Sequence, residues 1–292
     1  MHRKLSRIRT MEISALVAIL IASIAAISPF AKALVPCFFV TTSTENGSNV
    51  FTAKAVNQAS GTIDATGCDI GDYIDNDLSV SGLTVHDADK FGIFVDSGCI
   101  AAPLCVPGRS ITVTISGANV TNIGYHNGPA FMPNGVQFGI GILYDSGNLF
   151  SPLVKGYVDS STVSQYQKGG IVIKHNANVN TTNNSITGLG PVDFIAQNGI
   201  EYLSDTAIGV VRGNTVLGNF YTGQEGLRAD GTACGPSQGT TCPPGRLYTS
   251  TGILLVFVDP NNIKRGQNSV PGPGYPNGNQ HPYAVVTDSP LD

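Results

Sequence analysis

The sequence is poor in the residues on which many familiar sites depend. It has no tryptophan, three methionines and five histidines in 292 residues, and only 12% of its residues are charged. No two histidines have the H-E-x-x-H spacing of a metalloprotease, and the chain lacks a G-x-S-x-G nucleophile elbow and a P-loop. The absence of tryptophan also weakens the usual stacking platform for a sugar ring, although Phe94, Tyr144, Tyr157 and Tyr202 remain.

The first 33 residues are predicted to be a secretory signal peptide. A basic start precedes an apolar run from Ile13 to Ile27, and Ala31-Lys32-Ala33 fits a small-x-small cleavage site. The alternative is an uncleaved anchor, but the run has 15 residues and a spanning helix needs about 20. No other segment is as long and apolar. We therefore expect a secreted or cell-surface protein with no membrane span after cleavage.

Basic residues are scarce in the exported part. Cleavage after Ala33 removes five Lys and Arg but only one acidic residue, which leaves 11 Lys and Arg against 19 Asp and Glu. The formal charge then changes from −4 to −8. Because phosphate binding needs a basic surface, we expect no nucleic-acid partner.

All six cysteines lie in the exported part. An even count in an exported chain favours disulfides. Proximity in the sequence suggests three pairs, although other pairings remain open: Cys37–Cys68, Cys99–Cys105 and Cys234–Cys242. A metal site is the alternative reading of these cysteines, but the chain has neither C-x2-C pairs nor a histidine near them.

Copies of a repeated unit follow one another from residue 63 to residue 270. In each unit an apolar residue lies five positions after a small or apolar one, as Ile70 lies five positions after Ala65. Several units lead to a Gly-Ile pair: Gly92-Ile93, Gly141-Ile142, Gly170-Ile171, Gly199-Ile200 and Gly252-Ile253. The isoleucines at 142, 171 and 200 are 29 residues apart, a spacing typical of a solenoid. We predict an all-β, parallel β-helix of about six or seven short-stranded coils.

The other segments fit around this repeat. Residues 34–62 are predicted to cap its N-terminal end, and residues 124–135 and 221–250 to be insertions. Residues 271–292 are predicted to be a Pro- and Gly-rich tail with a last short strand near Tyr283–Val286. Three asparagines share one position in successive units, so we expect their side chains to stack and hydrogen-bond along the axis: Asn184, Asn214 and Asn268.

The repeats resemble those of a known group of proteins. The unit Val179-x-Thr181 followed by Asn184-Ser185-Ile186-Thr187-Gly188, and its counterpart from Val211 to Asn219, resemble units of right-handed parallel β-helix proteins, the pectate-lyase-like superfold. The stretches 166–171 and 195–200 are similar to secreted bacterial β-helix repeat proteins of unassigned function. The resemblance covers about residues 60–270 and implies a right-handed coil.

The resemblance transfers no catalytic residue. Polygalacturonases carry N-T-D, paired-Asp, G-H-G and R-I-K motifs, of which this chain has only Ile263-Lys264-Arg265. Pectate lyases usually carry Trp, Asp and His signatures, and this chain has no tryptophan. A copper-handling β-helix protein is disfavoured because methionine is scarce and the histidines form no pair.

One predicted face gathers the catalytic candidates. If the isoleucine of each Gly-Ile pair points inward, the first and third residues after it point outward. Most of these outward residues are apolar, so the face is either covered or the floor of a ligand groove. Asp145, Lys174 and Glu201 interrupt it on three successive coils and are candidates for acid–base work. The alternative is a surface ion-pair ladder, which contributes little to stability.

The turn before this face supplies candidates for ligand binding. Five residues in or beside it are expected to contact a carbohydrate: Phe94, Lys168, Asp193, Gln197 and Asn198. The alternative is that the polar ones are corner residues hydrogen-bonded to local backbone.

No metal or other cofactor is expected, with calcium as the alternative. An acidic run near the N-terminal end of the repeat offers the carboxylates that calcium prefers: Asp69, Asp72, Asp75 and Asp77. The run lacks the full D-x-[DN]-x-[DN]-G loop. Among the histidines, His126 in its glycine-rich insertion is the best functional candidate.

Two functions fit these observations. The first is a secreted, non-catalytic protein that binds an extracellular polysaccharide or cell-surface glycan, or serves as a structural surface protein. The alternative is a polysaccharide lyase or glycoside hydrolase that uses Asp145, Lys174 and Glu201. Convergence of these three side chains in an open groove would favour the enzyme, and a flat or covered face would favour the binding protein.

Overall fold

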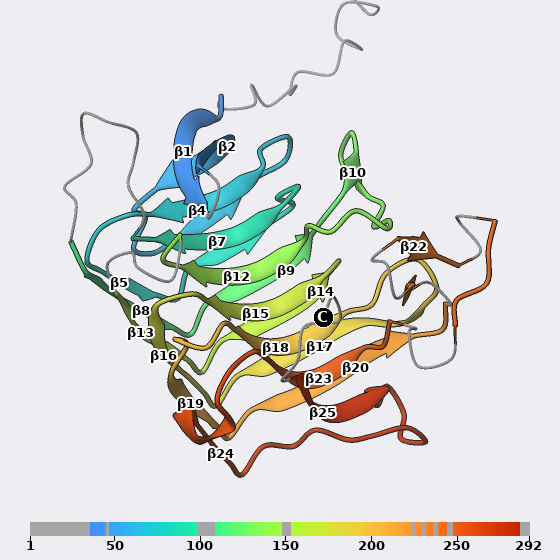
Figure 1. The fold of residues 1–292 in the computed structure, drawn as a ribbon. Coiled ribbons are helices and arrows are strands. Elements are labelled where there is room, and N and C mark those ends of the chain that lie inside the picture. The colour runs from blue at the N-terminus through green and yellow to red at the C-terminus, as the bar shows by residue number, and fades with distance from the viewer. Residues whose placement is uncertain are drawn as a thin grey trace, which may run out of the picture. The chain divides into compact units, whose positions relative to one another are not determined.

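Three long β-sheets make up the body of the structure (Figure 1). The computed structural model describes residues 36–44, 47–97, 109–147, 153–223, 226–228, 232–235, 239–243 and 248–286. The strands all belong to the unit that begins at Cys37. The predicted signal peptide, Cys99 and Cys105 lie outside the described residues.

Sheet A contains nine strands: β1 (Phe38–Thr44), β2 (Gly47–Val56), β4 (Ile70–Ile74), β7 (Phe91–Asp96), β12 (Ile140–Asp145), β15 (Gly169–Lys174), β18 (Asn198–Leu203), β23 (Thr251–Val256) and β25 (His281–Val286). Sheet B contains six: β3 (Thr62–Asp64), β6 (Thr84–His86), β9 (Asn119–Ile123), β14 (Thr162–Tyr166), β17 (Ser185–Val192) and β20 (Thr215–Tyr221). Sheet C also contains six: β5 (Leu78–Ser81), β8 (Ile111–Ser116), β13 (Val154–Asp159), β16 (Ala177–Thr182), β19 (Gly209–Arg212) and β24 (Ile263–Gly266), the last preceded by a 3-10 turn at Pro260–Asn262.

The chain visits the three sheets in a fixed order. Strands β3, β4 and β5 enter sheets B, A and C, and β6, β7 and β8 repeat the circuit, each parallel to a strand one coil earlier. Six such coils follow one another in the described chain, and β25 adds a parallel strand beyond β23. The predicted all-β parallel β-helix of about six or seven coils is confirmed.

The repeated isoleucines form the centre of the core. Ile142, Ile171 and Ile200 lie side by side in the register of sheet A, and all three are fully buried. Tyr144 and Ile173, two positions further along, also point into this core. Full burial of such a side chain stabilises the fold by about 1.5–3 kcal/mol, so the row fixes which face of sheet A points inward.

The glycine before each isoleucine allows adjacent coils to approach closely. A Cβ atom on Gly141 would lie 2.7 Å from the carbonyl oxygen of Gly170, and one on Gly170 would lie 2.5 Å from that of Gly199. The same two atoms would meet Val163 and Ile186 of sheet B at 2.3 and 2.6 Å. No side chain fits there, which explains why the Gly-Ile pair recurs.

The predicted asparagine ladder is present at the corner between sheets C and B. The Asn184 side chain donates to Oδ1 of Asn214, and the Asn214 side chain donates to Oδ1 of Asn268, both at 3.0 Å. Each Oδ1 also accepts the backbone N–H of the asparagine one coil earlier. Asn184 and Asn214 are each about 1% exposed, so the ladder satisfies polar groups that no water reaches.

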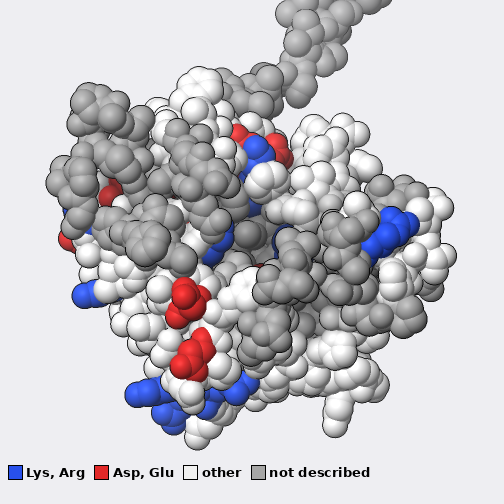
Figure 2. All heavy atoms as spheres, viewed as in Figure 1, with Lys and Arg blue, Asp and Glu red and all other residues white. Residues whose placement is uncertain are grey.

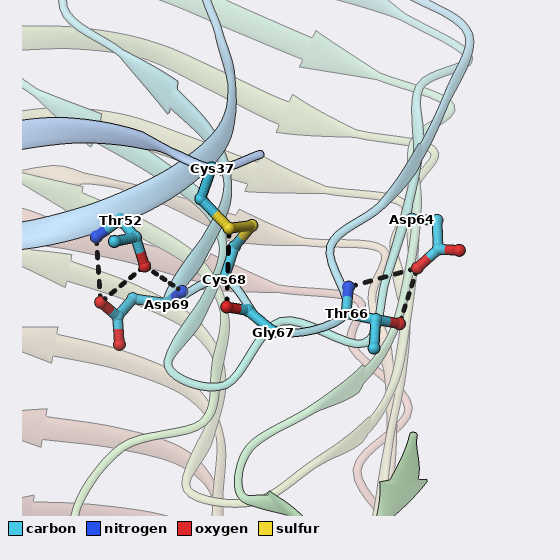
Figure 3. The surroundings of a disulfide bond; sticks show 7 residues. All are labelled: Cys37, Thr52, Asp64, Thr66, Gly67, Cys68 and Asp69. Carbon is cyan, nitrogen blue, oxygen red and sulfur yellow. Dashed lines mark hydrogen bonds between the residues drawn. A yellow bond between two sulfur atoms is a disulfide. The ribbon is translucent and has the colours of Figure 1, made fainter. Parts of the chain in front are cut away.

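Two of the predicted disulfides are confirmed. Cys37 is bonded to Cys68, so the antiparallel β1–β2 hairpin is tied to the first coil (Figure 3). Cys234 is bonded to Cys242 beside the small β21–β22 hairpin (Gly226–Leu227 and Ala233–Cys234). Another small hairpin, β10–β11 (His126–Asn127 and Ala130–Phe131), leaves sheet B after β9. Among the described residues, no helix has the length and apolar character needed to cross a membrane.

Candidate functional site

Sheet A brings the catalytic candidates to one face. Asp145 on β12 is the register partner of Lys174 on β15, and Glu201 on β18 is the partner of Val172 on β15. Glu201 therefore lies one coil beyond Lys174 and two residues back along the strand. Figure 2, in the view of Figure 1, shows basic and acidic side chains side by side in its upper part.

The apolar part of this face is buried. Phe94, Leu143 and Val172 are 3%, 5% and 2% exposed and form a second hydrophobic cluster on the opposite side of sheet A from the core. The Phe94 ring packs against Tyr73 and Phe91, with centroids 5.9 and 5.0 Å away. Phe94 therefore sits inside a packed cluster and presents little surface to a ligand.

Asp145 is already engaged by its neighbours. Its Oδ1 lies 2.5 Å from Nδ1 of the buried His175 and accepts the backbone N–H of Gly147 at 2.8 Å. Its Oδ2 lies 3.9 Å from Nζ of Lys174. Asp145 as a whole residue is only 8% exposed. Its carboxylate is therefore part of a local ion-pair network and is not an open catalytic carboxylate.

Glu201 has a different environment, formed by Lys168, Lys174 and Asn198; we call these four residues the Glu201 cluster. Burial raises the pKa of Glu201 above its ordinary value, and Lys168, the Asn198 hydrogen bond and Lys174 act in the opposite direction. Burial likewise lowers the pKa of Lys168, which Glu201 partly offsets. Both shifts favour the neutral forms of the two groups over their charged forms.

The turn residues divide into engaged and exposed groups. Gln197 is fully buried, and its amide donates to the carbonyl of Tyr166 at 2.7 Å and accepts the N–H of Leu189 at 3.1 Å. These two hydrogen bonds hold the backbone at the corner between neighbouring coils. Lys168 donates to the carbonyl of Ala196 at 3.1 Å, whereas Asp193 is exposed.

A small cavity of about 150 Å³ lies along the same corner, towards the N-terminal coils. We call it the Lys90 pocket, and its lining combines charged, amide and aromatic groups: Asp69, Asp89, Lys90, Tyr125, Phe138 and Gln167. Lys90 and Lys168 precede the inward isoleucines of β7 and β15 by three residues each. Their backbones are joined through Gly139, which donates to Lys90 and accepts from Lys168. The pocket and the Glu201 cluster therefore follow one another along the axis.

Lys90 organises this pocket. Its Nζ lies 3.0 Å from Oδ1 of Asp69 and 5.1 Å from the centre of the Phe138 ring. Burial would raise the pKa of Asp69, but hydrogen bonds from Thr52 and Lys90 outweigh it and hold the pKa below its ordinary value. The opposite wall is fixed by Gln167, whose Oε1 accepts the N–H groups of Tyr125 and Asn134.

The acidic run does not gather around one point. Asp69 accepts from Thr52, Asp75 from the side chain of Asn57 and Asp77 from the N–H of Thr112. Asp72 points inward and accepts the N–H of Gln58. Within the described chain, the group of carboxylate and imidazole side chains close enough to share a metal ion is instead Asp64, His86 and Asp87. Sequence spacing did not reveal it, because Asp64 meets His86 only through the pairing of β3 with β6.

No protein-family model, no curated protein and no solved structure matches this chain. The functional assignment therefore depends on the side chains described above.

Proposed function

We propose that this is a secreted β-helix protein of the pectate-lyase-like type that binds an extracellular polysaccharide or cell-surface glycan without cleaving it. The observation that carries the proposal is the Lys90 pocket, where aromatic rings, carboxylates, an ammonium and an amide line one cavity of about 150 Å³. Apolar ring faces combined with a few fixed polar groups suit a sugar ring.

The geometry favours an elongated ligand over a small isolated one. The Lys90 pocket and the Glu201 cluster lie along one corner of successive coils, each coil advancing by about 4.8 Å. A chain of sugar units that runs along the axis would meet Tyr125 and Lys90 first and Lys168 next. The acidic overall charge of the exported part agrees with a glycan and not a nucleic-acid ligand.

Binding of the full chain to a panel of neutral and acidic polysaccharides tests this proposal. We expect Tyr125→Ala to weaken binding by about twofold to tenfold, since an aromatic contact contributes about 0.5–1.5 kcal/mol. Tyr157→Ala removes a similarly exposed tyrosine from sheet C and serves as the matched control. If no polysaccharide binds, or if the two variants bind equally, the proposal is wrong.

A second candidate function, a polysaccharide lyase or hydrolase, is favoured by the paired pKa shifts of Glu201 and Lys168. Release of oligosaccharides, lost in Glu201→Gln and kept in the exposed control Asp205→Asn, would make the protein an enzyme. Binding without release would leave the non-catalytic function as the better assignment. Asp145→Asn tests separately whether the His175-bound carboxylate takes part.

A further inference from the structure

A cluster of carboxylates and imidazoles lies at the end of sheet B, beyond the Lys90 pocket. Asp64 and His86 are register partners on β3 and β6, and Asp87 follows His86 at a corner where its φ is +62°. One ligand atom from each of these three residues lies within 4.8 Å of the others. Thr66 donates to Oδ1 of Asp64 and leaves the other oxygen pointing away from it (Figure 3).

His126, on the β10–β11 hairpin, faces one member of this cluster, Asp87, from outside the group of three. The residue is only 9% exposed, and its ring packs against Phe131 with the centroids 5.3 Å apart. Its Nδ1 lies 3.0 Å from Oδ1 of Asp89. Its Nε2 is buried without a hydrogen-bond partner and faces Oδ1 of Asp87 at 3.6 Å. That oxygen also accepts from the Asn122 side chain at 3.1 Å, and Oδ2 of Asp87 lies 2.7 Å from Nδ1 of His86, so an ion would replace these bonds. A buried polar atom without a partner is costly, so its orientation needs a cause.

The spacing between His126 and Asp87 suits two ligands of one metal ion. An N–H···O hydrogen bond spans about 2.7–3.2 Å, and 3.6 Å exceeds it. Zinc bonds to nitrogen and oxygen of about 2.0–2.2 Å, at tetrahedral angles, place two ligand atoms about 3.3–3.6 Å apart. Asp89 holds Nδ1, as carboxylates commonly do for a metal-bound histidine, and so directs Nε2 towards the ion.

We propose that Asp64, His86 and Asp87 bind a divalent transition-metal ion of the zinc type, and that Nε2 of His126, which faces Asp87 from outside this group, turns to the ion as a fourth ligand. Imidazole nitrogens disfavour calcium, which takes oxygen ligands, and suit zinc and its neighbours. The His86 and Asp87 side chains are 29% and 22% exposed, so the ion can enter from solvent. Three carboxylates, those of Asp64, Asp87 and Asp89, supply the negative charge that a dication needs.

The ion would join parts of the chain that are distant in sequence. Asp64 belongs to the first coil, His86 and Asp87 to the second, and His126 to the hairpin that follows β9. Tyr125, next to His126, and Asp89, which holds its ring, both line the Lys90 pocket. Metal binding would therefore fix one wall of that pocket. Metal binding at these residues requires no glycan in the Lys90 pocket.

The direct experiment is titration of the EDTA-treated full chain with Zn²⁺ in a calorimeter, with Co²⁺ absorption as a second probe. We expect one tight ion per chain and a rise in melting temperature that EDTA reverses. His126→Gln and Asp87→Asn should each weaken binding by at least about tenfold. The exposed His281→Gln and Asp205→Asn are matched controls and should bind as the parent does.

Three results would overturn the proposal: no zinc binding at about 100 µM, equal binding by the parent and both site variants, or loss of binding in the controls. His86→Gln is a second site variant for the case in which His126→Gln misfolds. His86 is partly exposed, so its replacement should leave the circular dichroism spectrum unchanged. A folded His86→Gln variant that binds zinc as tightly as the parent would remove His86 from the site. If, in addition, His126→Gln unfolds, the whole proposal fails.

Discussion

Asn184 and Asn214 lie one coil apart and are joined by a 3.0 Å hydrogen bond between their side chains inside the protein. Oδ1 of Asn214 accepts this bond and the backbone N–H of Asn184, while its amide donates to the carbonyl of Thr181. Thr181 and Asn184 belong to the preceding coil, and the Asn214 amide also donates to Oδ1 of Asn268 on the following coil at 3.0 Å. One buried side chain thus joins its coil to both neighbouring coils.

Asn214→Ala should lower the free energy of unfolding by about 2–5 kcal/mol. It removes the buried acceptor of the Asn184 backbone N–H and of one side-chain N–H of Asn184, and the donor to the Thr181 carbonyl; the Asn184 side chain keeps only its bond to Val158. Urea denaturation measures the change. Asn178→Ala alters an exposed asparagine of sheet C and is the control. Equal midpoints for the two variants would show that the ladder does not stabilise the fold.

Gly170→Ala should be destabilising by about 1–3 kcal/mol, because its Cβ would lie 2.5 Å from the carbonyl oxygen of Gly199. Gly266→Ala is the matched control, since a Cβ there meets nothing within 4 Å. Thermal unfolding of both variants checks this. A Gly170→Ala protein as stable as the control would mean that the coils can separate at little cost.

Removing the Cys37–Cys68 bond should cost about 3–4 kcal/mol, because its ends are 31 residues apart in sequence and the unfolded chain gains the freedom of that loop. The loss should fall on the β1–β2 hairpin and the first coil. Hydrogen exchange of a Cys37→Ala, Cys68→Ala protein would then be faster in β2 than in β18. Uniformly faster exchange across all coils would contradict this local effect.

The coil architecture was predictable from the sequence because it is periodic. The 29-residue spacing of Ile142, Ile171 and Ile200 already places these residues on successive coils, and the Asn184 ladder and the neighbourhood of Asp145, Lys174 and Glu201 follow from the same register. A constant repeat turns sequence separation into distance.

The Lys90 pocket and the Asp87–His126 contact were not predictable in this way. Both depend on the path of the segment around His126, and this segment belongs to no repeat. It is held in place by Gln167, which accepts the N–H of Tyr125 and lies 42 residues beyond it in the sequence. The sequence also did not decide whether Phe94 is buried, since an outward apolar row fits either a groove or a covered face. Side-chain partners outside the repeat were therefore beyond the reach of spacing arguments.

Asp72 should make stability fall as pH rises. The residue lies in the inward row of sheet A with no exposed surface, and burial raises its pKa from 3.8 to about 7, with the Gln58 N–H acting in the opposite direction. The folded protein therefore keeps a proton that the unfolded chain releases above about pH 4. Stability is highest below the unfolded pKa and decreases through the window from about pH 4 to pH 7, by at most about 4 kcal/mol.

Asp72→Asn removes this titration while keeping an oxygen for the Gln58 N–H. We expect the variant to be more stable than the parent at pH 8, about equal to it at pH 4, and flatter in its pH profile between them. Urea midpoints measured across that range give both curves, and Asp75→Asn, on the same segment but partly exposed, is the control. A parent profile that rises from pH 4 to pH 7, with no flattening in Asp72→Asn, would show that this carboxyl stays ionised in the folded state.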